Sequence, residues 1–190
     1  EPIAVEDWSR PLGALSAPLG VHAVLGNHDY WSDIAFQRDP SREPVVIQAL
    51  QAAGVSVLVN QALRLEKDGH AFWLAGLGDQ IALLARYGHG YDNGVDDLTG
   101  MLAQVSDDSP VIMMAHEPDV FLTPDPRVSL TLSGHTHGGQ VNASYGSALY
   151  PAGLFRRPEG DLIVSRGLGC SSLPMRIGNW PEILLIELGA

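Results

Sequence analysis

The stretch Leu132-Ser133-Gly134-His135-Thr136-His137-Gly138-Gly139-Gln140 places two histidines two residues apart, directly after the apolar run 128–132. Because the side chains of a strand alternate between its two faces, a strand that ends in His-x-His should point both imidazoles the same way. The glycines allow a sharp turn and a close approach of the backbone. Two convergent neutral imidazoles favour a transition-metal site, although a polar loop of hydrogen-bonded histidines fits the same pattern.

Two other segments have the same layout, in which an apolar run is followed by a polar tip that carries histidine. Residues 24–31 read Val-Leu-Gly-Asn-His-Asp-Tyr-Trp, and residues 111–119 read Val-Ile-Met-Met-Ala-His-Glu-Pro-Asp. The unbroken apolar run before His116 is typical of a strand that is covered on both faces. Since ligand sites of α/β sheets gather at the carboxyl ends of strands, we expect the three tips to share one site.

Bulk composition excludes several classes of protein. The chain has 190 residues and a net charge of −11, which argues against a nucleic-acid-binding surface, where a basic face is expected. No apolar run approaches the roughly 18 residues that span a bilayer. Cys170 is the one cysteine, so an intrachain disulfide is excluded, and we expect it to be a packed small residue.

The remaining pattern predicts alternating helices and strands. Helical signals cover 44–53 and 98–105, with Pro44 near the start and Gly54 just past the end of the first. Asp68-Gly69 predicts a hairpin turn between strands at 63–66 and 71–75. Further strands are predicted at 21–25, 55–59, 111–115, 128–132, 162–165 and 183–187.

Three motifs carry a resemblance to a known family. Gly26-Asn27-His28-Asp29, the single His116 after its apolar run, and Gly134-His135-Thr136-His137 resemble the last three motifs of the calcineurin-like metallophosphoesterases. The late Ser165-Arg166-Gly167-Leu168-Gly169 is similar to a bacterial branch that includes envelope-associated phosphodiesterases. The resemblance runs over 21–188 and implies an α/β (α+β) fold, a four-layer α/β/β/α sandwich that forms one domain over 1–190.

The same resemblance implies a dinuclear metal site. Asn27, His116 and His135 correspond to ligands of the second metal, and His137 to a ligand of the first. This mixed nitrogen and oxygen set suits two divalent ions of Mn, Fe or Zn better than Ca or Mg. In the family, such a pair supplies a metal-activated hydroxide that hydrolyses a phosphoester, here a phosphodiester.

His28 and Asp29 are the catalytic residues that the resemblance implies. The family assigns this histidine to protonating the leaving oxygen or stabilising charge, with the neighbouring aspartate orienting its ring. For Asp29 the alternative is a cap or turn bond beside Tyr30. The substrate-binding residues stay unassigned, and the loop 86–94 is either a recognition loop or a variable surface loop.

One departure from the family favours a second hypothesis. The two earlier family motifs, Asp-x-His and Gly-Asp-x-x-Asp, do not occur before Gly26. The chain is then the C-terminal part of such a domain, and the alternative function is an inactive truncated module that holds one metal or none. Because exposed strand edges invite pairing, we expect a homo-oligomer or a missing N-terminal segment to complete the sheet.

The resemblance also sets the expected substrate and location. We expect a phosphoester of a small molecule or a phosphodiester of lipid or cell wall, and a place in the bacterial cytoplasm or cell envelope.

Overall fold

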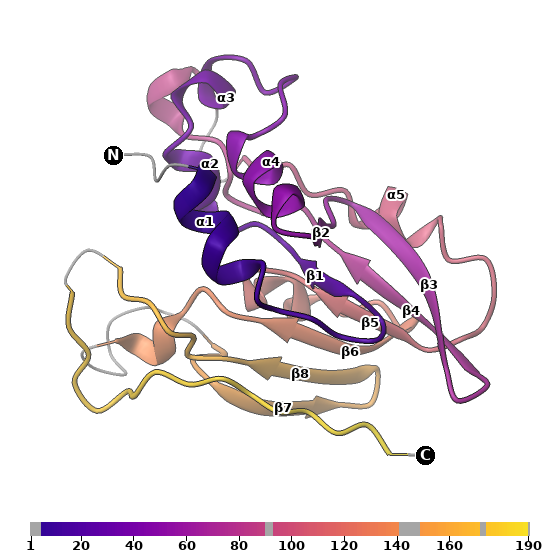
Figure 1. Cartoon of the computed structure of the whole chain (residues 1–190). Helices are drawn as coiled ribbons and strands as arrows, with labels where there is room; N and C mark the ends of the chain where they lie inside the picture. The colour runs from indigo at the N-terminus through magenta and orange to yellow at the C-terminus, as the bar shows by residue number, and fades with distance from the viewer. Residues whose placement is uncertain (1–4, 90–92, 141–148, 172–173, 190) are drawn as a thin grey trace. The chain divides into compact units, whose positions relative to one another are not determined.

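The computed structural model describes residues 5–89, 93–140, 149–171 and 174–189, and Figure 1 draws their helices and strands. The chain divides into two units, Glu1–His116 and Glu117–Ala190. Among the described residues, no helix has the length and apolar character needed to cross a membrane.

The first unit contains short helices around two sets of strands. Its helices are α1 (Val5–Leu12), α2 (Asn27–Trp31), α3 (Ile34–Arg38), α4 (Val45–Ala52), η1 (Ala85–Tyr87, a 3₁₀ turn) and α5 (Leu98–Leu102). Its strands are β1 (Val21–Ala23), β2 (Val55–Val57), β3 (Gln61–Lys67), β4 (His70–Gly76) and β5 (Val111–Met114).

Pairing in this unit is mixed. β1 runs parallel to β2, with Val21 opposite Val55, and β4 runs parallel to β5, with Trp73 opposite Val111. β3 and β4 form an antiparallel hairpin that leaves only Asp68-Gly69 as its loop. Both loop residues have positive φ, +53° and +82°, as a two-residue hairpin turn that matches strand twist requires.

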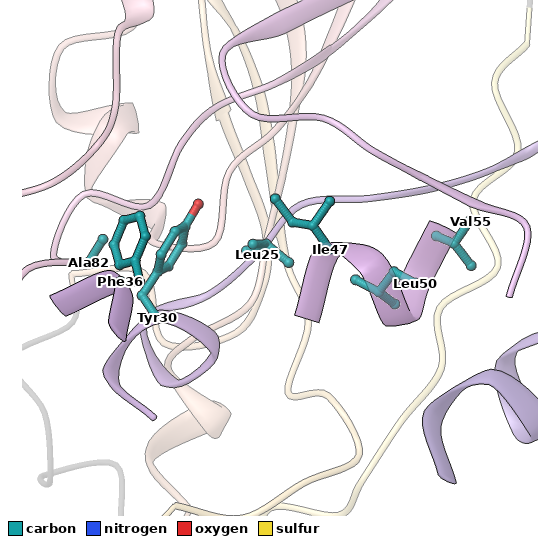
Figure 2. Close-up of a cluster of buried hydrophobic side chains, with 7 residues drawn as sticks. All are labelled: Leu25, Tyr30, Phe36, Ile47, Leu50, Val55 and Ala82. Atoms are coloured by element: carbon teal, nitrogen blue, oxygen red, sulfur yellow. The ribbon is translucent and has the colours of Figure 1, made fainter. Parts of the chain in front are cut away.

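A cluster of buried side chains supports the segment that follows β1. Figure 2 shows the cluster, which consists of Leu25, Tyr30, Phe36, Ile47, Leu50, Val55 and Ala82. The rings of Tyr30 and Phe36 have their centroids 5.1 Å apart. The buried Gln37 amide donates to the carbonyls of Tyr30 and Ala82, which ties α3 to α2 and to the loop after β4. The polar tip at 26–29 is therefore anchored from both sides by packed apolar residues.

The second unit is built on a smaller mixed set of strands. Its elements are η2 (Pro118–Leu122, 3₁₀), β6 (Val128–Ser133), η3 (His137–Gly139, 3₁₀), β7 (Gly153–Arg157) and β8 (Gly160–Val164). β8 is parallel to β6, with Leu132 opposite Ile163, and antiparallel to β7. Phe121, Tyr150, Leu162 and Val164 are its buried cluster.

The structure confirms an α/β fold with mixed sheets, the hairpin at Asp68-Gly69 and the helix that begins after Pro44. The four-layer sandwich and the single domain stay predictions. The strand predicted at 183–187 is wrong, because those residues have no strand conformation and Ile183 and Leu185 are 83% and 89% exposed. Cys170 is also exposed rather than packed.

Candidate metal centre

The polar tip of the first unit begins at Gly26, the N-cap of α2. The Asp29 carboxylate accepts a hydrogen bond from the Gly26 backbone N–H at 2.9 Å, which closes the first turn of the helix. Asn27 follows Gly26 and is only 2% exposed. Its carboxamide oxygen has no hydrogen-bond partner among the described residues. A buried acceptor without a donor is unfavourable, and a bound cation would satisfy it.

The two predicted catalytic residues differ in environment. His28 is exposed, and its ring lies edge-on against Trp31 with centroids 5.1 Å apart. Burial raises the pKa of the Asp29 carboxyl group, while the Gly26 hydrogen bond and the nearby His28 lower it. The bond that the structure gives Asp29 is the helix cap, which was the alternative reading of this residue; its action on His28 stays a prediction.

His116 lies beside the same tip. It follows β5 by two residues, and a methyl group added at Gly26 would meet three atoms of its ring at 2.6–2.7 Å. The His116 ring therefore lies directly against the Gly26 backbone, next to Asn27 in the chain. Only glycine leaves room for this approach. Two of the three predicted tips, 90 residues apart in sequence, thus meet within the first unit.

A buried carboxylate that sequence reasoning missed directly follows His116 in the chain. Glu117 is 3% exposed at the start of η2, and its Oε1 lies 3.7 Å from Nδ1 of His135. His116 is the residue before Glu117 in the chain. His116, Glu117 and His135 each offer one ligand atom, and these three atoms lie within 4.8 Å of one another. His116, Glu117 and His135 could therefore hold a metal ion. The sequence did contain a signal for this residue: Glu117 directly follows His116 at the end of an apolar run.

The donor types of this group fit a borderline transition metal. Two imidazole nitrogens and one carboxylate oxygen are a common set for Zn and for Fe or Mn. A cation would also stabilise the buried Glu117 carboxylate. His116 and His135 of this group were predicted as ligands, together with Asn27 and His137. The ligand roles of all four stay predictions.

The expected geometry of His-x-His is wrong in one respect. β6 ends at Ser133, two residues before His135, so the two histidines are not at strand positions. Both have positive φ, +63° and +53°, which places them in left-handed backbone conformations. Alternation of side chains along a strand therefore does not set the directions of these rings.

Curated relatives match nearly the whole chain. A "Transmembrane protein with metallophosphoesterase domain" from Bos taurus is 34% identical over 95% of this chain and 41% of its own length. The uncharacterized metallophosphoesterase YkuE from Bacillus subtilis is 34% identical over 93% of this chain and 59% of its own length. An uncharacterized metallophosphoesterase from Aquifex aeolicus is 30% identical over 95% of this chain and 65% of its own length. The chain thus spans about half of the relatives it matches.

The other comparisons are less informative. No family model matches the chain. The solved structure of the sulfate thiohydrolase SoxB is similar with a TM-score of 0.47 and 13% identity, over 76% of this chain and 27% of that one. This structural similarity is too low to bear on function. The sequence relatives, by contrast, support a relationship with the metallophosphoesterase superfamily.

Proposed function

We infer that this chain is part of a calcineurin-like metallophosphoesterase, a hydrolase that acts on phosphoester bonds, and we propose a phosphodiester as its substrate. The observation that carries this proposal is the His116, Glu117 and His135 group, which could hold a metal ion. The 30–34% identity to proteins named metallophosphoesterases supports the same class of reaction. The substrate class we propose is a small-molecule, lipid or cell-wall phosphodiester.

The proposed site holds two ions of Mn, Fe or Zn. Asn27, His116 and His135 would hold one ion and His137 would be a ligand of the other. The buried Asn27 oxygen supports this assignment, because among the described residues it has no hydrogen-bond donor. When bound, such a pair polarises a phosphoryl oxygen and lowers the pKa of a coordinated water.

His28 has the properties of a proton donor to the leaving oxygen. Its imidazole is exposed, so a substrate can reach it, and one side of the ring packs edge-on against Trp31. Asp29 holds the first turn of α2 in place through its bond to Gly26, and this fixes the backbone that carries His28. A positioned general acid contributes about 10²–10⁴-fold to rate.

The test is a metal-content measurement on the 190-residue chain, followed by hydrolysis of an aryl phosphodiester and an aryl phosphomonoester. We expect His135→Ala to lower the metal-dependent rate at least about 100-fold, because metal stabilisation of charge amounts to several kcal/mol. His70→Ala is the matched control, since His70 is exposed beside the hairpin turn. Equal rates for His135→Ala and the wild type would refute the proposal.

A second candidate function is a metal-binding module without catalysis. It is favoured by the finding that the described residues contain one group of three metal-ligating side chains rather than two. One bound ion per chain and no hydrolysis of either ester would support this module. Two ions and turnover would exclude it.

A further inference from the structure

The turn that carries His137 has an unusual backbone. Four successive residues, His137 to Gln140, have φ values of +53°, +63°, +84° and +47°. A side chain larger than hydrogen costs roughly 1–2 kcal/mol in a left-handed conformation, so His137 and Gln140 need support from their surroundings. The support comes from the residues that follow β8.

Gln140 is held by a reciprocal pair of hydrogen bonds to Ser171. The Gln140 amide donates to the Ser171 carbonyl at 2.9 Å, and the Ser171 N–H donates to the amide oxygen of Gln140 at 2.7 Å. The N–H of Ile177 donates to the Gln140 carbonyl at 2.9 Å. Three hydrogen bonds thus fasten the end of the turn to Ser171 and Ile177.

The beginning of the turn is held by Arg176. Its Nη1 donates to the His137 carbonyl at 3.3 Å, and its Nη2 donates to the Arg166 carbonyl at 2.7 Å. Its Nε donates to the Gly169 carbonyl at 2.9 Å, and Nη2 also contacts that carbonyl. We call Arg176 and these three carbonyls the arginine clamp. A planar guanidinium suits this role because its donors are fixed in a rigid fork.

The clamp also surrounds one ring nitrogen of His137. Nδ1 of His137 lies 3.1 Å from the Gly169 oxygen and 3.3 Å from Nη2 of Arg176. Nη2 has two hydrogens, and the nearer carbonyls of Gly169 and Arg166 accept both. With both hydrogens of Nη2 directed to these carbonyls, the contact between Nδ1 and the Gly169 oxygen is favourable when Nδ1 carries the proton. In a neutral imidazole this leaves the lone pair on Nε2.

We propose that the arginine clamp is a positioning device that selects the Nδ1–H tautomer of His137 and presents its Nε2 lone pair to a metal ion. Arg176 is then a positioning residue, because it contacts His137 and would not contact the ion itself. A backbone carbonyl that accepts from the second ring nitrogen is the usual way of fixing a metal-binding histidine. The metal-ligand role of His137 rests on the proposed function, whereas its tautomer is a property of the metal-free chain.

The test reads the tautomer directly. The full chain is labelled with ¹⁵N-histidine, and the ring nitrogens of His137 are assigned by loss of their signals in His137→Gln. Spectra of the metal-free protein are recorded at a pH where imidazoles are neutral. Zn²⁺ affinity is then measured by calorimetry for the wild type, Arg176→Lys and the control Arg156→Lys, whose side chain is 76% exposed on β7.

We expect a protonated Nδ1 and an unprotonated Nε2 in the wild type. Arg176→Lys keeps the charge but loses the fork, so it should mix the two tautomers and weaken Zn²⁺ binding about 10–100-fold. Arg156→Lys should change neither. An Nε2–H tautomer in the wild type would overturn the proposal whatever the variants do. A folded Arg176→Lys variant with the same tautomer and the same Zn²⁺ affinity as the wild type would also overturn it. If the clamp behaves as expected but no variant binds Zn²⁺, the positioning device stands and the proposed function fails.

Discussion

Gly26→Ala is the substitution that best tests the packing of the proposed ligand His116. The added methyl group would lie 2.6 Å from Cε1 and Nε2 of the His116 ring, whereas ordinary contacts begin at 3.4 Å, so the ring must retreat by about 0.8 Å. Gly26 has a φ of −110°, so alanine adopts its backbone without strain and the effect is steric. Overpacking of this kind typically costs about 1–3 kcal/mol of folding stability.

The displaced ring should also bind metal less well. A shift of nearly 1 Å at a functional group can cost about 100-fold, so we expect Zn²⁺ affinity to fall by roughly one to two orders of magnitude. Calorimetric Zn²⁺ titration and urea unfolding measure the two effects separately. Gly134→Ala is the matched control, because it precedes His135, has no positive φ and has nothing within 4 Å of an added methyl group.

The reasoning fails if Gly26→Ala retains both the stability and the Zn²⁺ affinity of the wild type. That result would mean that the His116 ring does not lie against Gly26. A loss of stability with unchanged affinity would instead mean that the ring lies there but does not bind metal. Only this second outcome would separate the packing of His116 from its ligand role.

Two further predictions concern the first unit. Asp107 accepts hydrogen bonds from the Trp73 indole, Ser109 and Arg64, and these bonds lower the pKa of its carboxyl group. The stability that they contribute is present above the ordinary pKa of 3.8. It is lost as the pH falls from there toward the lowered pKa. Asp107→Asn should therefore lose less stability than the wild type over that acid range in urea unfolding at several pH values, and parallel profiles would contradict this. Gly69→Ala should cost about 1–2 kcal/mol by the same assay, because φ is +82° while nothing lies within 4 Å of the added methyl group. A Gly69→Ala variant as stable as the wild type would mean that the hairpin loop has another conformation.

Local chemistry explains the elements that were predictable from sequence. The Asp68-Gly69 turn depends on two residues that tolerate positive φ, and the helix α4 on its apolar pattern and flanking Pro44 and Gly54. A strand at 183–187 would instead need a neighbouring strand to accept and donate its backbone hydrogen bonds. Its residue types favour a strand, but none pairs with it among the described residues, so the apolar pattern misled the prediction.

Candidate ligands could be named from sequence because only a few residue types bind transition metals and because they follow buried strands. Asn27, His116, His135 and His137 stood out in this way, and two of them lie in the group that could hold a metal. Glu117 was missed, because a glutamate in a polar tip is ordinarily solvated. Only burial distinguishes this carboxylate from the exposed acids of a chain with 22 Asp and Glu residues.

The sequence by itself determined which residues can bind a metal, where the chain turns and which runs are apolar, since these properties act over a few neighbouring residues. Only the tertiary structure decided that the ring of His116 lies against Gly26, that Glu117 is buried beside His135 and that Arg176 holds the turn of His137. The physical reason is that these contacts join residues 18 to 90 positions apart. Their distances depend on the packing of the elements between them, which no local pattern encodes.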